Sequence, residues 1–123
     1  MEINFNALTV ICGSEGPQRA IINLMIDGTE HEVTARGDGP VDAIFKGITM
    51  ICPHNAVLEL YQVHAVTEGT DAQAKVTVRL SEDGFTATGI AAHTDTMTAS
   101  AKAYVNALNR LLLRQSKSLS KKV

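Results

Sequence analysis

The sequence has few aromatic side chains and no tryptophan, which limits the partners that it can bind. Only 4% of its 123 residues are Phe, Trp or Tyr. Proteins that bind single-stranded nucleic acid without sequence preference stack the bases on aromatic rings. The formal net charge of −2 gives no excess of positive charge to attract a phosphate backbone or an anionic membrane surface. We therefore expect neither nucleic acid nor membrane as a partner.

Long apolar runs and a secretory signal are also lacking. No stretch approaches the roughly 18 apolar residues of a membrane-spanning helix. The first residues, MEINFNALTV, lack the positively charged region with which a signal peptide begins. Cys12 and Cys52 could form a disulfide, but two buried thiols in a reducing compartment fit the composition better. We therefore expect a cytoplasmic protein.

No residue pattern indicates catalysis or a metal centre. His31, His54, His64 and His93 do not occur at a ligand spacing such as H-x-x-x-H. Neither a G-x-S-x-G motif nor a Cys-His pattern stands out. His64, close to Tyr61 in a strand-like segment, is interpreted as a core or interface residue. We predict no catalytic residue, no metal and no cofactor in this chain.

Alternating polarity predicts strands, and the length suits one domain with one core. Apolar and polar residues alternate over residues 71–80, 19–26 and 30–35. Asp-Gly occurs at 27–28 and at 83–84, and this dipeptide is typical of a tight hairpin. Antiparallel strands are therefore expected in both halves of the chain.

Two segments have helical periodicity, one over about residues 41–51 and one over about 96–113. Pro53 cannot continue the first helix. The second has an apolar stripe made of Met97, Ala101, Tyr104, Leu108 and Leu111. The polar, basic residues 116–123 are expected to be a frayed, disordered tail, with a phosphate-binding tail as the alternative.

The order strand, strand, strand, helix occurs twice. A shift of 56 residues aligns Val10 with Val66, Gly13 with Gly69, Asp27-Gly28 with Asp83-Gly84, Ala43 with Ala99 and Lys46 with Lys102. We therefore predict an α+β fold of two pseudo-symmetric βββα units, each a three-stranded antiparallel sheet covered by a helix. Unit one spans about residues 5–52 and unit two about 57–113, within a single domain of residues 1–115.

The strand-like segment 57–67 has apolar residues on both faces. Simple alternation places Leu58, Leu60 and Val66 on one face, and Val57, Tyr61, Val63 and Ala65 on the other. One helix covers only one face of a sheet, so another face needs a partner. A second copy of the chain, in a homodimer, is the simplest partner for that face.

The turn Gly37-Asp38-Gly39-Pro40 precedes the first helix. Pro40 suits the first helical position, which makes Gly39 the N-cap. Amides at such an end lack helical partners and, with the helix dipole, favour an anion. The alternative is a plain strand-to-helix turn. Before the second helix, Thr94, Thr96 or Thr98 could cap, and Asp95 favours the positive end of the dipole.

Three motifs together resemble the C-terminal allosteric, dimerisation domain of 2-isopropylmalate synthase. They are GDGPVDA (37–43), LYQVHAVTEGTDAQAKVTVRL (60–80) and DTMTASAKAYVNALNRL (95–111), and the resemblance covers roughly residues 5–113. It implies two βββα units, a homodimer, and leucine as the feedback inhibitor of leucine biosynthesis. The similar domain of citramalate synthase senses isoleucine, and a ligand-free dimerisation module is a further alternative. His93 departs from the Asp that relatives often carry.

The resemblance implies a set of effector-binding residues. They are Gly37, Gly39, Val41, Asp42, Leu58, Tyr61, Ala65 and Ile90. The amides of residues 37–41 suit a leucine carboxylate. The ammonium would be accepted by backbone carbonyls, Asp38 or Asp42, and the isobutyl group by Val41 and the apolar residues of segment 58–65.

The catalytic barrel of that family, which carries its divalent metal, is absent from these 123 residues. We therefore expect a separated regulatory domain or a stand-alone relative that catalyses nothing. Its expected partners are a second copy, leucine or isoleucine, and the catalytic barrel of a parent synthase.

Overall fold

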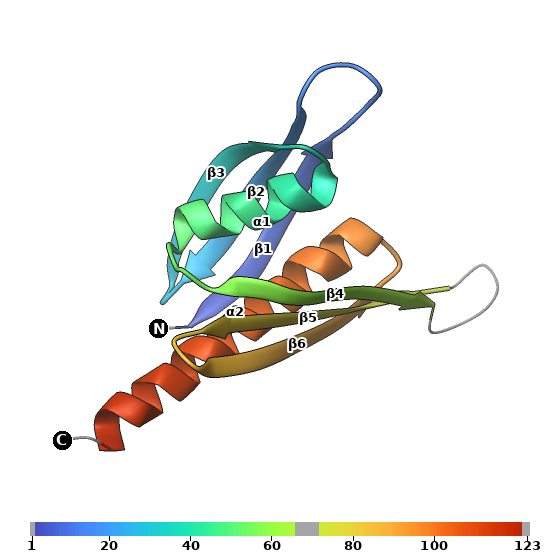
Figure 1. Cartoon of the computed structure of the whole chain (residues 1–123). Coiled ribbons are helices and arrows are strands. Elements are labelled where there is room, and N and C mark those ends of the chain that lie inside the picture. Colours follow the sequence, from blue (N-terminus) through green and yellow to red (C-terminus); the bar gives the residue numbers. More distant parts are fainter. Residues whose placement is uncertain (1, 66–71, 122–123) are drawn as a thin grey trace. The chain divides into compact units, whose positions relative to one another are not determined.

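Each half of the chain forms three strands followed by one helix (Figure 1). The computed structural model describes residues 2–65 and 72–121, with side chains up to residue 117 in the last helix. The chain divides into two compact units, Glu2–His54 and Asn55–Val123. The N-terminal unit contains β1 (Ile3–Ile11), β2 (Gln18–Ile26), β3 (Thr29–Gly37) and α1 (Pro40–Ile51). The C-terminal unit contains β4 (Val57–Ala65), β5 (Ala74–Glu82), β6 (Phe85–His93) and α2 (Thr96–Lys121).

Both sheets are antiparallel, with the strand orders β1-β2-β3 and β4-β5-β6. The predicted α+β class and the repeated βββα order are therefore confirmed. Asp27 and Gly28 have φ values of 49° and 84°, and Asp83 and Gly84 have φ values of 52° and 82°. Positive φ at both central residues matches the twist of the flanking strands. The two Asp-Gly hairpins are thus formed as predicted.

The core of the N-terminal unit lies between α1 and one face of its sheet. Ala20, Ile22 and Leu24 alternate along β2 and are completely buried. From the helix, Ala43, Ile44 and Ile48 are completely buried as well. Since α1 packs against β2 and β3, the alternation of β2 and the helical periodicity of 41–51 are two halves of the same core.

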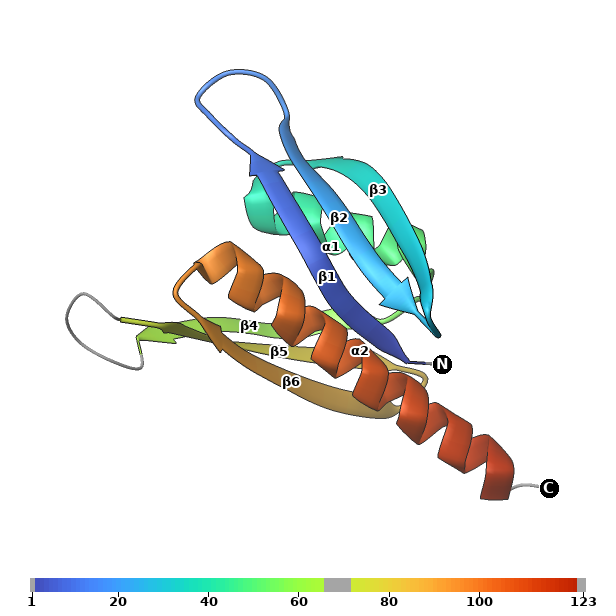
Figure 2. The same cartoon turned by 180° about the vertical axis from the view of Figure 1, so that it is seen from behind.

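In the C-terminal unit, α2 lies across β5 and β6 (Figure 2). Val76, Val78 and Leu80 of β5 are completely buried on the face toward the helix. The approach is closest at Gly89, where an added Cβ would lie 2.1 Å from the Ala103 carbonyl oxygen. The small residues of both elements therefore bring helix and sheet backbones into direct contact.

A β-bulge in β4 changes which of its side chains share a face. The register shifts between Leu58 and Leu60, so that Leu58 lies opposite Leu80 and Tyr61 lies opposite Val78. Residues directly opposite each other point to the same side of a sheet. Leu58 therefore shares the helix side with Tyr61, and the prediction that they lie on opposite faces is wrong. The extra residue at the bulge reverses the alternation, and Val66 lies outside the described residues.

The first strand of each unit also corrects the repeat. Phe5 lies opposite Leu24 and Leu58 lies opposite Leu80, while Leu24 and Leu80 correspond at the shift of 56. Phe5 therefore corresponds to Leu58, three residues short of that shift, because Leu58 and Leu80 are three residues further apart in the chain than Phe5 and Leu24. The alignment of Val10 with Val66 does not hold, and Gly69 lies outside the described residues.

The second helix is longer than predicted. It continues from Thr96 to Lys121, so residues 116–121 are helical where a tail was expected. Neither glycine nor proline follows Leu113 to stop it. Across the described residues, no helix is both long and apolar enough to cross a membrane.

Candidate functional site

The turn before α1 has the predicted geometry. Gly39 is the N-cap with extended backbone (φ −160°, ψ 173°), and Pro40 follows at the first helical position. The Ala43 amide donates to the Gly39 carbonyl at 3.0 Å, which closes the first helical turn. No side chain caps this end. The amides of Val41 and Asp42 therefore mark a helix start that an external acceptor can approach.

The two glycines of this turn are present for different reasons. A Cβ on Gly37 would lie 2.5 Å from the Ala43 nitrogen and 2.6 Å from Oδ2 of Asp42. Close packing alone therefore explains Gly37. A Cβ on Gly39 would meet nothing within 4 Å. Neither space nor a positive φ requires glycine there, and a side chain would project into the open space before the helix.

Asp42 holds the turn together. Its Oδ2 accepts the Asp38 amide at 2.9 Å and pairs with Lys46 Nζ at 2.9 Å. The hydrogen bond from Lys46, followed by that from the Asp38 amide, lowers the pKa of Asp42. The same pairing raises the pKa of Lys46. Asp42 is thus engaged inside the turn, which leaves Asp38 and backbone carbonyls as the freer acceptors for an ammonium group.

The start of α2 differs because Asp95 caps it with a carboxylate. The Ala99 amide donates to the Asp95 carbonyl at 3.0 Å, which makes Asp95 the N-cap rather than one of the neighbouring threonines. Its carboxylate accepts the amides of Met97 and Thr98 at 3.2 Å and 3.3 Å and the Thr98 hydroxyl at 2.6 Å. The prediction that a threonine caps this helix is therefore wrong. Asp is at least as favourable as Thr at the N-cap position.

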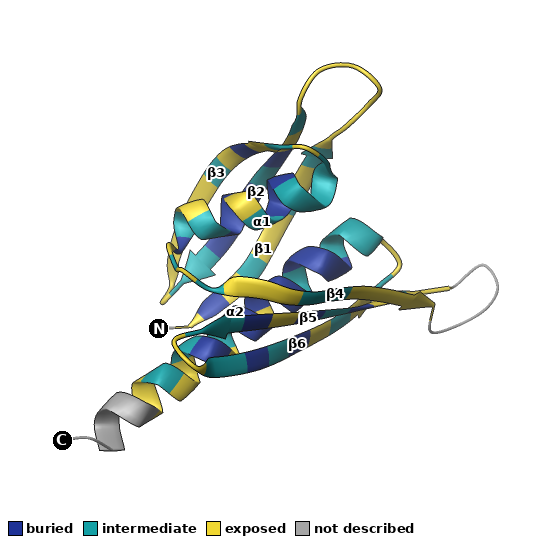
Figure 3. Ribbon diagram, viewed as in Figure 1, coloured by how far each residue is buried: buried dark blue, intermediate teal, exposed yellow. Residues whose placement is uncertain are grey.

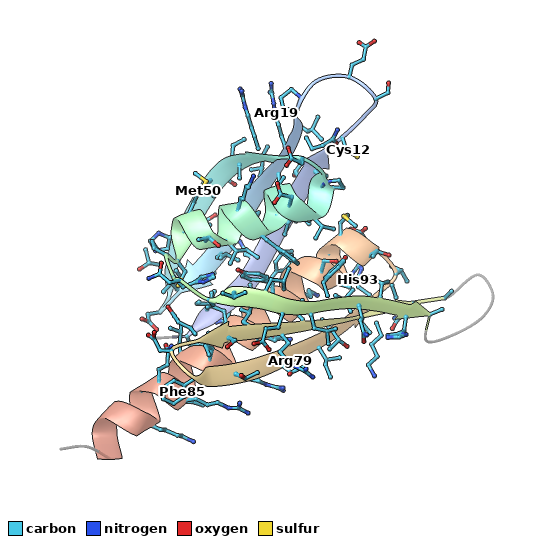
Figure 4. The ribbon with its side chains drawn as sticks, viewed as in Figure 1. Cys12, Arg19, Met50, Arg79, Phe85 and His93 are labelled. Atoms are coloured by element: carbon cyan, nitrogen blue, oxygen red, sulfur yellow. The ribbon has the colours of Figure 1, made fainter. Side chains whose placement is uncertain are left out.

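These bonds lower the pKa of Asp95, with the Thr98 side chain as the largest cause. His93, at the end of β6, accepts the Asp95 amide through Nδ1 at 2.9 Å (Figure 4). Asp95 corresponds to Gly39 at the shift of 56. A carboxylate thus occupies the start of α2, and the equivalent position at α1 has no side chain to supply one.

Three of the predicted apolar residues come together on one face of β4. Leu58, Tyr61 and Ala65 lie opposite Leu80, Val78 and Ala74, on the side that faces α2. Because α2 packs against β5 and β6, this part of β4 is incompletely covered (Figure 3). Leu58 is 42% exposed, and Val63 on the same face is 44% exposed. Val63 is not among the site residues predicted from the sequence.

Tyr61 is anchored by α2. Its hydroxyl lies 2.7 Å from Ser100 Oγ, and Ser100 Oγ donates to the Thr96 carbonyl at 2.8 Å. Since the Ser100 proton is used on Thr96, Tyr61 donates to Ser100. Ser100 is completely buried. A serine in the middle of an apolar helical stripe was the signal for this contact, because such a side chain bonds back along its own helix.

Ile90 lies apart from the other apolar site residues. It is opposite Thr77 on β5, hence on the sheet face turned away from α2, and it is 46% exposed. The sheet itself separates it from Leu58, Tyr61 and Ala65. Gly37, Gly39, Val41 and Asp42 belong to the N-terminal unit.

Among the described residues, the cysteines and acidic side chains form no cluster that could bind a metal ion. Both cysteines are free, Cys52 buried and Cys12 exposed, so the expectation that both are buried is wrong for Cys12. Burial raises the pKa of the Cys52 thiol. Over residues 2–65 and 72–121, no three His, Cys, Asp or Glu side chains gather in a group that could hold a metal ion.

Comparisons with known proteins agree on one family. Residues 1–112 match the family model of the LeuA allosteric (dimerisation) domain. The 2-isopropylmalate synthase of Caulobacter vibrioides (strain NA1000 / CB15N) is 61% identical over 117 residues, which are 95% of this chain and 22% of that protein. The synthase of Rhodopseudomonas palustris (strain HaA2) is 53% identical over 122 residues, 99% of this chain and 23% of that protein. That of Bradyrhizobium diazoefficiens is 56% identical over 115 residues, 94% of this chain and 22% of that protein. The chain thus spans less than a quarter of the length of these relatives.

Proposed function

The chain belongs to the family of LeuA allosteric (dimerisation) domains, and we propose that it is the leucine-sensing regulatory domain of a 2-isopropylmalate synthase. Its relatives of that name are more than four times as long. The acyl-transfer chemistry and its divalent metal would belong to the remainder of such a parent protein. Leucine would bind here and lower the activity of the parent, which is feedback inhibition of leucine biosynthesis.

The observation that carries this proposal is the uncapped start of α1. A free amino acid carries a carboxylate that accepts hydrogen bonds from exposed amides, and the helix dipole favours that negative charge. In the C-terminal unit the corresponding helix start is occupied by the carboxylate of Asp95. At the start of α1, where Gly39 is the N-cap, no side chain occupies the corresponding position. An external carboxylate therefore fits there.

The apolar face of β4 suits an aliphatic side chain. Leu58, Tyr61 and Ala65 share this face, and the bond from Tyr61 to Ser100 fixes the tyrosine ring. Burying an isobutyl group contributes about 1.5–3 kcal/mol. Leucine and isoleucine differ in shape rather than polarity, so apolar contacts of this kind separate them by about 1–3 kcal/mol.

A second copy of the chain would cover the exposed part of this face. Val63 and Leu58 are large apolar side chains with more than two fifths of their surface exposed. For leucine to regulate the parent, it must bind one arrangement of the dimer more tightly than another, with a coupling of about 1–3 kcal/mol. A ligand held where two copies meet would supply that difference.

A thermal melt of this chain with each proteinogenic amino acid tests the proposal. A ligand that binds only the folded state stabilises it by about 2.7 kcal/mol at 100 times its Kd. A chain of this size shifts by about 4 °C per kcal/mol, so the midpoint would rise by about 10 °C. A rise with leucine alone supports the proposal, and a rise with isoleucine alone would transfer it to the citramalate synthase type. No rise with any amino acid would favour a ligand-free dimerisation module.

A further inference from the structure

A row of side chains on α2 hydrogen-bonds to the backbone of β6. The three bonds run from Asn106 Nδ2 to the Ile90 carbonyl (3.1 Å), from Arg110 Nη1 to the Thr88 carbonyl (2.7 Å) and from Arg114 Nη1 to the Thr86 carbonyl. We call Asn106, Arg110 and Arg114 the edge ladder. β6 is an outer strand of its sheet, in the order β4-β5-β6. The ladder therefore acts on a strand edge rather than on a face.

The spacing of the two elements makes this ladder regular. Its donors are four residues apart on the helix, a rise of about 6 Å. Its acceptors are two residues apart on the strand, a rise of about 6.6–6.8 Å. The helix runs antiparallel to β6, because the donor numbers rise as the acceptor numbers fall. Alternate carbonyls of an edge strand point away from its neighbour. Successive donors of the edge ladder therefore bond to successive outward-pointing carbonyls of β6.

The sequence of β6 explains why such a cover matters. An outer strand with unpaired backbone groups is a template for another strand, and natural proteins protect it with charges, proline or a covering element. The strand FTATGIAAH contains no Asp, Glu, Lys, Arg or Pro. It is rich in Thr and contains Ile, both of which favour strands. Without the ladder, β6 would be an open, uncharged edge.

In the N-terminal unit, charged side chains protect the edge of the outer strand that corresponds to β6. This strand is β3, TEHEVTARG, and it carries Glu30, Glu32 and Arg36. Glu30 and Glu32 correspond to Thr86 and Thr88 at the shift of 56. The N-terminal helix has only 12 residues, whereas α2 has 26 and its later turns carry Arg110 and Arg114. The last strand of the N-terminal unit is charged and is followed by a short helix, whereas the last strand of the C-terminal unit is uncharged and is followed by a long one.

We propose that the edge ladder closes the β6 edge to strand pairing with a second copy of this chain. Copies then associate through other surfaces, and the regulatory dimer does not extend into open-ended, sheet-paired assemblies. This inference concerns a strand edge and does not depend on leucine binding.

The double variant Arg110→Ala/Arg114→Ala tests the ladder. It exposes the Thr86 and Thr88 carbonyls and favours helix no less than the native residues. It also changes the net charge from −2 to −4, which by itself would reduce association. We expect assemblies larger than the native oligomer to appear in sedimentation velocity at about tenfold lower protein concentration. Lys75→Ala/Lys117→Ala, which removes the same charge outside the ladder, is the matched control.

Hydrogen exchange identifies the surface that pairs. The amides of Thr86, Thr88 and Ile90 point outward with their carbonyls, so new protection at these three in the assembled variant supports the proposal. Adding Thr88→Glu should reverse the assembly, because it places on β6 the charge that Glu32 places on β3. Arg79, which Figure 4 labels, lies on β5 directly opposite Thr88. It would pair with the new carboxylate.

Three results would overturn the proposal. They are association equal to that of the control at all soluble concentrations, association that leaves the β6 amides unprotected, and association that Thr88→Glu does not reverse. If circular dichroism shows that the double variant is unfolded, Arg110→Ala alone, which retains the other two donors, is assayed in the same way. Its association must then exceed that of Lys117→Ala for the proposal to stand.

Discussion

At the scale of single residues, the turn before α1 separates packing from binding. Gly37 lies against the backbone of Ala43, whereas Gly39 borders open space. A sequence motif does not distinguish these two roles, because both positions are glycines of the same short turn. Gly37→Ala and Gly39→Ala therefore form a matched pair of variants that tests the proposed carboxylate-binding site.

Gly39→Ala should abolish the stabilisation of the chain by leucine and should lower its ligand-free stability by only about 0.5–1 kcal/mol, because Ala is a poorer N-cap than Gly. The new methyl group meets no protein atom within 4 Å, but it projects into the space before the helix. Gly37→Ala should instead lower the stability by about 1–3 kcal/mol, because its methyl group overlaps the first turn of α1. Calorimetric titration and thermal melts measure both. If Gly39→Ala binds leucine with native affinity, the start of α1 is not the site that binds the leucine carboxylate.

Tyr61 and Ser100 should be energetically coupled. Ser100→Ala leaves the Tyr61 hydroxyl without the acceptor that it has at 2.7 Å, which should cost about 1–3 kcal/mol. Tyr61→Phe alone should cost about 0.5–1.5 kcal/mol. In a double-mutant cycle by urea unfolding, the second substitution should then cost less than it does alone. Strictly additive losses would show that the bond contributes little.

Asp95 should make the stability of the C-terminal unit depend on pH. Its pKa is lowered in the folded state, so its contribution is fully present above the unfolded value of about 3.9 and is lost as the pH falls through the folded value. Asn is an equally good cap that does not titrate in this range. Asp95→Asn should therefore retain stability at pH 7 and lose less of it than the native chain as the pH falls from about 5 to 2. Urea unfolding across this pH range measures the difference.

At the scale of elements, the backbone contact at Gly89 sets how closely α2 approaches its sheet. Gly89→Ala would place a methyl group 2.1 Å from the Ala103 carbonyl and 2.3 Å from the Ala107 nitrogen. Since helix and sheet must then move apart, we expect a loss of about 1–3 kcal/mol or more. Gly13→Ala, where a methyl group meets nothing within 4 Å, should change stability by less than about 0.5 kcal/mol. Equal midpoints for the two variants in denaturant would contradict the close approach.

At the scale of the whole molecule, the family assignment and the exposed face of β4 both point to self-association. Val63→Glu should shift the proposed dimer toward monomer, because a carboxylate on the proposed apolar contact surface must be desolvated when the copies meet. Sedimentation equilibrium over a range of concentrations measures the change. Lys75→Glu, on the other face of the sheet and directly opposite His64, serves as the control. A dimer of native affinity in Val63→Glu would place the interface elsewhere.

By itself, the sequence determined the α+β class, the two βββα units, the Asp-Gly hairpins and the start of α1 at Gly39-Pro40. These features depend on local backbone preferences and on periodicity, which neighbouring residues carry. The three motifs were also sufficient to indicate the family.

Only the tertiary structure decided what depends on pairing between distant residues. The bulge in β4 placed Leu58 beside Tyr61, and the sheet separated Ile90 from both. The bond from Tyr61 to Ser100 spans 39 residues of chain. Arg110 and Arg114 of α2 hydrogen-bond to the backbone of β6, contacts that helical propensity does not predict. Strand register and long-range hydrogen bonds are set when elements pack together, and no window of neighbouring residues specifies them.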